Sequence, residues 1–189
     1  AIAIGREELV RGAGTLARVP LEGGAPREVV ENVSLADWSP DGRDLAIVHK
    51  VGGNSRLEFP IGKVIYETGL YIGAMRFSPR GDRLALTPGD GSIVVLDLAG
   101  KAMTLSKGWG EIGDLAWRPD GSEIWFSGVR SIGKFALYAL SLSGRERLVR
   151  EEAGGLFLHD ISKGGHVLVS DYLFNQSLAA LPAGESSER

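Results

Sequence analysis

The sequence contains no cysteine, which excludes disulfide frameworks, thiolate metal sites and cysteine nucleophiles. This absence is compatible with either side of a membrane, because many exported domains have no disulfide. No apolar run approaches the roughly 18 residues that are needed to cross a bilayer, so direct membrane insertion is not expected. The formal net charge is only −3, which gives no electrostatic reason to expect a nucleic acid or an anionic membrane as partner.

The N-terminus also lacks the features of a natural chain start. Residues 1–5 read Ala-Ile-Ala-Ile-Gly, with no initiator methionine and no signal-peptide pattern. They read like an internal β-strand, and we expect the chain to come from a longer protein.

Glycine, by contrast, is abundant, with 27 of 189 residues. No collagen period or low-complexity tract accounts for it, so the excess predicts many tight turns. The apolar runs between these turns are short, and a helical period of apolar residues is not sustained anywhere. The sequence therefore predicts an all-β fold with almost no helix.

A turn of the type aromatic-Ser-Pro-Asp-Gly recurs along the chain. Trp38, Phe77 and Trp117 begin three clear copies, and a weaker fourth copy begins at Ile161. Successive copies are 39 (77 − 38), 40 (117 − 77) and 44 (161 − 117) residues apart. A period of about 40 residues with several strands per unit is typical of β-propeller blades. In each unit the aromatic residue is expected in the core, Pro and Gly form the turn, and a strand follows.

The spacing predicts a β-propeller arc of four-stranded antiparallel blades, in a single domain that spans residues 1–189. The predicted units are a partial blade, three complete blades and a second partial blade, at 1–33, 34–74, 75–113, 114–155 and 156–189. A closed ring needs about four to eight blades, so this arrangement leaves unpaired blade edges. An incomplete reading frame, a homo-oligomer that closes the ring, and an open arc all explain it.

These turns resemble the TolB-like, WD-like propeller repeats of bacteria. Residues 14–29, 57–68 and 140–149 more closely resemble the propeller that follows the kinase domain in some bacterial serine/threonine protein kinases. The motifs of the kinase domain itself are absent. The resemblance implies a non-enzymatic sensing or protein-docking role in a bacterial signalling protein. It carries over no ligand-binding residues, because the shared motif is a structural turn.

Two alternatives stay open. The first is a TolB-like periplasmic envelope protein that docks a lipoprotein partner. The second is the propeller portion of a hydrolase or peptidase, whose catalytic groups would come from elsewhere in a longer protein. Fold alone does not decide between them.

Two aspartates of the repeated turns, Asp41 and Asp120, could be interpreted as calcium ligands. Arg80 and Gly164 stand at the equivalent positions, however, and an aspartate in such a turn normally bonds its own backbone. The glycine pairs at 52–53 and 154–155 lack the sequence context of a phosphate loop and are interpreted as ordinary loops. We predict no metal and no cofactor.

A catalytic triad of His159, Asp160 and Ser170 is not predicted. No nucleophile-elbow motif surrounds Ser170, and adjacent residues of a strand face opposite sides. We therefore predict that the chain is not an enzyme.

The predicted binding surface is the face of the propeller that carries the inter-blade loops. Its candidate residues are Tyr71, Trp109 and Glu111, because exposed aromatic anchors among adaptable glycines suit protein or peptide recognition. The partner is expected to be a protein, a peptide or a small ligand. The alternative for Trp109 is that its ring folds back over the end of a blade and packs there.

Overall fold

The described part of the chain, residues 2–5, 12–131 and 133–171 of a computed structural model, consists of β-strands joined by turns and contains no helix. All strand pairs are antiparallel and belong to four sheets. The prediction of an all-β fold is confirmed. The strands are β1 (Ile2–Gly5), β2 (Gly14–Arg18), β3 (Arg27–Trp38), β4 (Leu45–Val51), β5 (Asn54–Glu58), β6 (Val64–Thr68), β7 (Ile72–Phe77), β8 (Arg83–Pro88), β9 (Ile93–Asp97), β10 (Ala102–Ser106), β11 (Glu111–Trp117), β12 (Glu123–Val129), β13 (Ala136–Ser141), β14 (Glu146–Arg150), β15 (Leu156–Ile161) and β16 (Val167–Asp171).

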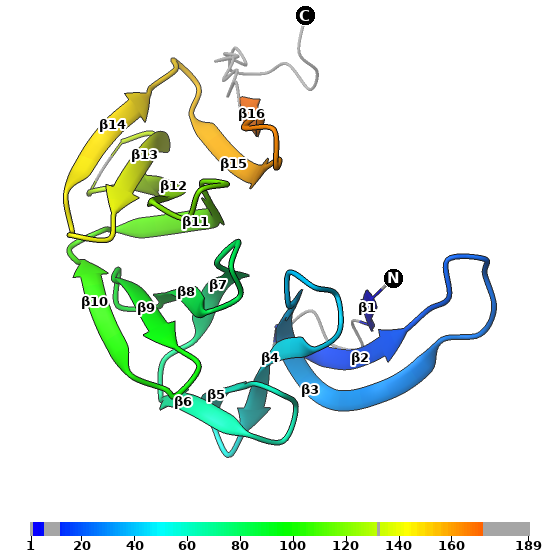
Figure 1. The fold of residues 1–189 in the computed structure, drawn as a ribbon. Helices are drawn as coiled ribbons and strands as arrows, with labels where there is room; N and C mark the ends of the chain where they lie inside the picture. The colour runs from blue at the N-terminus through cyan, green and yellow to red at the C-terminus, as the bar shows by residue number, and fades with distance from the viewer. Residues whose placement is uncertain (1, 6–11, 132, 172–189) are drawn as a thin grey trace, which may run out of the picture.

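The sheets are arranged as an arc around a common axis (Figure 1). Strands β7–β10 and β11–β14 form two four-stranded sheets, β15 and β16 form a two-stranded sheet, and β1–β6 form one six-stranded sheet. The first strands lie against one another around the inside of the arc: β3 contacts β7, β7 contacts β11, and β11 contacts β15. This arrangement is that of a β-propeller, as the repeat predicts.

The six-stranded sheet arises because β3 is one continuous strand that belongs to two blades. Its first half pairs with β2 and its second half with β4. Asn32 has a left-handed backbone with φ of 57°, the conformation that asparagine tolerates best after glycine, and the β2–β3 register shifts there. The predicted unit boundary between residues 33 and 34 therefore falls inside a bent strand. The two neighbouring sheets also begin three residues before the predicted starts at 75 and 114, at Ile72 and Glu111.

The repeated turns have one geometry. The amides of Gly42, Gly81 and Gly121 donate to the carbonyl three residues earlier, at 2.7, 2.9 and 2.8 Å. All three glycines have a positive φ, between 71° and 74°, which a residue with a β-carbon adopts at a cost. These turns set the point at which each first strand ends.

The hydrophobic core lies between adjacent sheets rather than at the centre of the arc. Val48 and Leu57 of one sheet pack with Met75 and Leu86 of the next. Ala85 and Val95 of that sheet pack in turn with residues of β11–β13. The axis itself is thus left to the polar residues of the first strands.

Candidate functional site: an axial cavity

A cavity of about 940 Å³ lies where the first strands of the four sheets end. Its walls come from β3, β7, β11 and β15 and from the turns that follow them. The lining residues are Ala36, Asp37, Trp38, Pro40, Arg76, Phe77, Ser78, Pro79, Ala116, Trp117, Pro119, His159, Asp160, Ile161, Ser162 and Lys163. Four segments that are about 40 residues apart in the sequence therefore build one site.

One repeat position supplies three charged residues of this wall. The residue immediately before the repeated aromatic position is Asp37, Arg76, Ala116 or Asp160, and all four line the cavity. The aromatic residues beside them, Trp38, Phe77 and Trp117, line the cavity as well. The sequence prediction missed these residues. The fixed position before the aromatic was the signal that could have revealed them.

Each first strand is also irregular. The pairing register shifts in β7 between Ile72 and Met75 and in β11 between Ile112 and Leu115. Comparable shifts occur in β3 and β15. A bulge of this kind bends a strand and redirects its side chains, and bulges are frequent next to functional sites.

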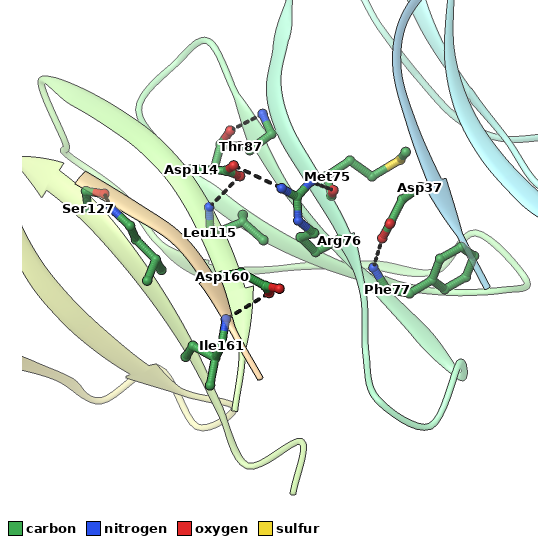
Figure 2. A network of polar contacts seen from close by, with 12 residues as sticks. Asp37, Met75, Arg76, Phe77, Thr87, Asp114, Leu115, Ser127, Asp160 and Ile161 are labelled. Carbon is green, nitrogen blue, oxygen red and sulfur yellow. Dashed lines mark hydrogen bonds and ion pairs between the residues drawn. The ribbon is translucent and has the colours of Figure 1, made fainter. Parts of the chain in front are cut away.

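The polar residues at the axis form a short network (Figure 2). The amide of Phe77 donates to Asp37 Oδ2 at 2.8 Å, and Arg76 Nη2 pairs with Asp114 Oδ2 at 2.9 Å. The second guanidinium nitrogen, Nη1, donates to the carbonyl of Met75 at 3.0 Å. These contacts connect β3 to β7 and β7 to β11, and they fix the orientation of Arg76.

The environment of Asp37 shifts the pKa of its carboxyl upward. Burial of the carboxyl raises its pKa above the usual value for an aspartate. The hydrogen bond from the Phe77 amide and the positive charge of Arg76 oppose this rise, and the negative charge of Asp114 adds to it. A carboxylate with a raised pKa inside a cavity is a feature of functional sites as well as of structural networks.

Aromatic and proline side chains form the rest of the wall. Phe77 and Trp117 are buried, whereas Trp38 is half-buried, and the Trp117 indole nitrogen donates to the carbonyl of Arg76 at 3.1 Å. Pro40 and Pro79 also line the cavity, and both are exposed. The lining of the cavity thus combines apolar rings with charged side chains.

The residues predicted for binding lie elsewhere, and none of them lines the cavity. Tyr71 precedes β7 and Glu111 begins β11, whereas the cavity lies at the far ends of both strands. Tyr71 is 62% exposed, and a β-carbon on Gly89 would come within 2.3 Å of its Cε1 atom, so its ring lies against that glycine. Glu111 is exposed. These two residues keep the exposure that the prediction requires.

Trp109 is only 4% exposed and packs inside the molecule. Its ring makes edge contacts with Phe126 and Tyr138, with centroids 4.8 and 4.7 Å apart, and its indole nitrogen donates to Ser106 Oγ at 2.8 Å. The guanidinium of Arg130 covers the ring at 3.9 Å from the centroid. The alternative in which Trp109 folds back over the blade end therefore describes the structure, and its side chain offers no exposed anchor.

His159 and Ser170 face each other across β15 and β16, with Nε2 2.9 Å from Oγ. Asp160 bonds the amide of Ile161 instead of orienting the histidine. Both His159 and Asp160 are exposed. The pair has a nucleophile and a base within reach of each other, but within the described residues no third group completes a triad.

The turn aspartates behave as parts of their turns. Asp41 accepts from the Arg43 amide and the Ser39 hydroxyl, and Asp120 accepts from Ser122. These hydroxyl hydrogen bonds lower the pKa of both carboxyls. Among the residues that the structure describes, no cluster of three or more histidine or acidic side chains could hold a metal ion. The same residues contain no helix that is long and apolar enough to span a membrane.

Comparison with known proteins supports the fold but gives no sequence relative. No protein-family model matches the chain, and no curated protein matches it either. The kinase-associated setting that the sequence predicts therefore has no support from either comparison.

Two solved structures share the architecture. TolB from Acinetobacter baumannii superposes with a TM-score of 0.70 at 19% identity, over 90% of this chain and 44% of that protein. A putative TolB from Agrobacterium tumefaciens gives a TM-score of 0.67 at 23% identity, over 90% of this chain and 68% of that one. The chain thus has a TolB-like β-propeller fold, and it spans less than half the length of the Acinetobacter protein.

Proposed function

We propose that this chain is a non-enzymatic binding module that holds a segment of a protein or peptide in the axial cavity. The observation that carries the proposal is the cavity itself, about 940 Å³ in volume and walled by corresponding positions of four successive units. Ligand pockets usually have volumes of about 300–1,000 Å³ and combine apolar walls with a few placed polar groups. The aromatic, proline and charged lining of this cavity has that composition.

The prolines and aromatic rings of the lining favour an extended peptide segment over a flat protein surface. Pro40, Pro79 and Pro119, from the turns of three units, line the cavity together with Trp38. Rigid apolar groups of this kind lose little conformational entropy when a ligand packs on them. An inserted loop or chain end would therefore pack on the apolar rings of the lining and be positioned by its polar groups.

The test is a selection for peptides followed by cavity mutation. A phage-displayed library of random peptides is selected on the immobilised chain, and the affinities of the recovered peptides are measured by calorimetry. His159→Trp places an indole at the exposed wall of the cavity, and Tyr71→Ala removes an exposed ring that does not line it, before the start of β7. We expect His159→Trp to weaken binding by about tenfold or more and Tyr71→Ala to leave it within about twofold.

The opposite pattern of affinities would place the binding site elsewhere on the molecule. Loss of binding in Tyr71→Ala alone would assign recognition to the inter-blade loop face, a second candidate that the 62% exposure of Tyr71 and its seat against Gly89 favour. Failure to recover any peptide that depends on either position would contradict a peptide-binding role.

Two settings follow from the resemblances. A signalling protein of the kinase-associated type remains a hypothesis that rests on the sequence, whereas the TolB-like fold is compatible with an envelope protein that docks a lipoprotein. The contact between His159 and Ser170 favours testing the hydrolase alternative too. Turnover of p-nitrophenyl acetate that disappears in Ser170→Ala would contradict the non-enzymatic proposal.

A further inference from the structure

We infer that residues 177–181 pair with the free edge of β16 and cover an apolar groove at that end of the arc (Figure 1). These residues lie outside the described part of the chain, in the predicted partial blade at 156–189. None of the residues that line the groove lines the axial cavity, so this surface is separate from the proposed binding site.

The groove lies between the third sheet and the two-stranded sheet, and its volume is about 380 Å³. Its lining is apolar apart from Arg150. Covering such a surface with another apolar segment is favourable. The apolar lining residues are Trp125, Leu137 and Val149 from the third sheet and Leu156, Val167 and Val169 from β15 and β16.

Val169 is more exposed than its counterparts in the two four-stranded sheets. Each second strand has a residue that pairs with a core residue of the first strand: Leu86 in β8, Phe126 in β12 and Val169 in β16. Leu86 and Phe126 are fully buried, whereas Val169 is 37% exposed. The strands β8 and β12 have a neighbour on both edges, but β16 pairs only with β15 among the described strands. Its free edge can therefore accept one more strand.

Third strands fill the corresponding space between the other sheets. Leu96 of β9 belongs to the core between the first and second sheets, and Leu140 of β13 belongs to the core between the second and third. The core between the third sheet and β15–β16 has no counterpart of these two leucines among the described residues. An extended segment with apolar side chains on one face fits this space.

The repeat places a third strand at residues 177–181. The third strands β5 and β9 begin 16 residues after the repeated aromatic position (54 − 38 and 93 − 77), and β13 begins 19 residues after it (136 − 117). Sixteen residues after Ile161 is position 177 (161 + 16), where the sequence reads Ser-Leu-Ala-Ala-Leu-Pro. Its Leu-Ala-x-Leu-Pro pattern resembles the Leu-Ala-x-Val-Pro of residues 16–20, which begins in β2 and whose Leu16 is fully buried.

A segment of the same chain has an advantage over a strand from another molecule. The connection from β16, residues 172–176, has five residues, compared with four between β8 and β9 and six between β12 and β13. A short flexible connection gives an effective concentration of about millimolar. The chain's own segment is therefore favoured over a second copy or a free peptide.

Hydrogen exchange of the full-length chain, followed by mass spectrometry of the peptides that cover β16, tests this pairing. Leu178→Asp/Leu181→Asp places two charges in the proposed strand, and Ser186→Asp/Ser187→Asp places the same two charges beyond it. We expect β16 to exchange at least about tenfold faster in Leu178→Asp/Leu181→Asp than in the wild type or the serine variant, because a charge on an apolar surface opposes pairing. Exchange of β8 should be the same in all three proteins.

Equal exchange of β16 in the three proteins would overturn the inference. Protection of β16 that increases with protein concentration would overturn it as well, because it would assign the groove to a second copy. If the leucine variant unfolds as a whole, β8 also exchanges faster, and the following measurement decides.

The chain has no cysteine, so two introduced cysteines report only on each other. Val169→Cys is combined in turn with a cysteine at each position from 177 to 181, and equilibration with glutathione gives the stability of each disulfide within the chain. A disulfide needs Cα atoms about 4.4–6.8 Å apart, and in a paired strand only directly opposite residues meet that condition well. We expect one position to exceed both of its neighbours by about tenfold or more. Stabilities that vary smoothly along the segment, or disulfides formed mainly between chains, would contradict the pairing.

Discussion

The carboxylate of Asp37 and the main-chain amide of Phe77 are joined by a hydrogen bond of 2.8 Å between two different sheets. Asp37 lies on β3 and Phe77 on β7, so the bond fixes one first strand against the next. Trp117 makes the following link, because its indole nitrogen donates to the carbonyl of Arg76. The residues that wall the cavity therefore also hold adjacent sheets together.

Asp37→Asn should slightly stabilise the fold at neutral pH. The folded state raises the pKa of this carboxyl, chiefly through burial, so the ionised form destabilises the fold at neutral pH. Asparagine keeps an oxygen for the Phe77 amide without the charge. We expect the melting temperature to rise by a few degrees at most at pH 7, since about 1 kcal/mol corresponds to ~2–4 °C for a chain of this length.

The pH dependence provides the check on Asp37. Below the usual aspartate pKa the wild-type carboxyl is protonated in both states, so the gain from Asp37→Asn should disappear there and grow as the pH rises through the higher folded pKa. Asp37→Ala is the control: it removes the acceptor from the buried Phe77 amide and should cost about 1–3 kcal/mol. A gain that is equal at low and neutral pH would contradict burial of the charge as its cause.

Ser127→Ala should weaken the contact between the third and fourth sheets. Ser127 is fully buried, and its hydroxyl accepts the amide of Leu158 at 2.7 Å, from β12 to β15. Alanine leaves that buried amide without an acceptor, at a cost of about 1–3 kcal/mol in the free energy of unfolding, measured by urea denaturation. Ser143→Ala changes an exposed hydroxyl and should have almost no effect. If Ser127→Ala lost no more free energy of unfolding than Ser143→Ala, the Ser127 hydrogen bond would contribute little to stability.

The repeat made the fold predictable because its information is local. A turn that needs Pro and then a glycine with positive φ can be recognised within five residues, and Gly42, Gly81 and Gly121 all form that turn. The bend of β3 at Asn32 was not predictable in the same way. A single asparagine in a polar segment does not distinguish a loop from a strand that continues from one blade into the next.

The candidate site was harder to predict because it depends on contacts between units. Trp109 lies in a glycine-containing loop that suggests exposure, yet Phe126 and Tyr138 of the next sheet bury its ring. Asp37 and Asp160 are 123 residues apart (160 − 37) and meet only because successive sheets turn around an axis. Their common position before the repeated aromatic was visible in the sequence, but the cavity that gives it meaning was not.

Trp109 should matter for stability and not for ligand binding. Trp109→Ala removes a buried indole that contacts two aromatic rings, and we expect it to lower the free energy of unfolding by about 3–5 kcal/mol. Trp109→Phe keeps much of the ring packing and should lose less. Peptides recovered by the selection should bind Trp109→Phe with wild-type affinity in calorimetry, because Trp109 does not line the cavity. A folded Trp109→Phe protein that no longer binds them would instead place Trp109 in the recognition surface.

Gly91→Ala and Gly89→Ala form a matched pair within one turn. At Gly91, where φ is 72°, a β-carbon would lie 2.0 Å from the carbonyl oxygen of Trp109, and this backbone contact cannot move without displacing the loop that holds the indole. At Gly89 the nearest atoms to a β-carbon belong to the ring of Tyr71, at 2.3 Å, and that exposed side chain can swing away. We expect Gly91→Ala to cost at least ~2 kcal/mol and Gly89→Ala less than ~1 kcal/mol, measured by urea denaturation. Gly89→Ala should nevertheless displace the Tyr71 ring, so it also tests whether that seated ring contributes to recognition at the inter-blade loop face. If Gly89→Ala proved as costly as Gly91→Ala, the Tyr71 ring would have to be held in place far more firmly than its exposure indicates.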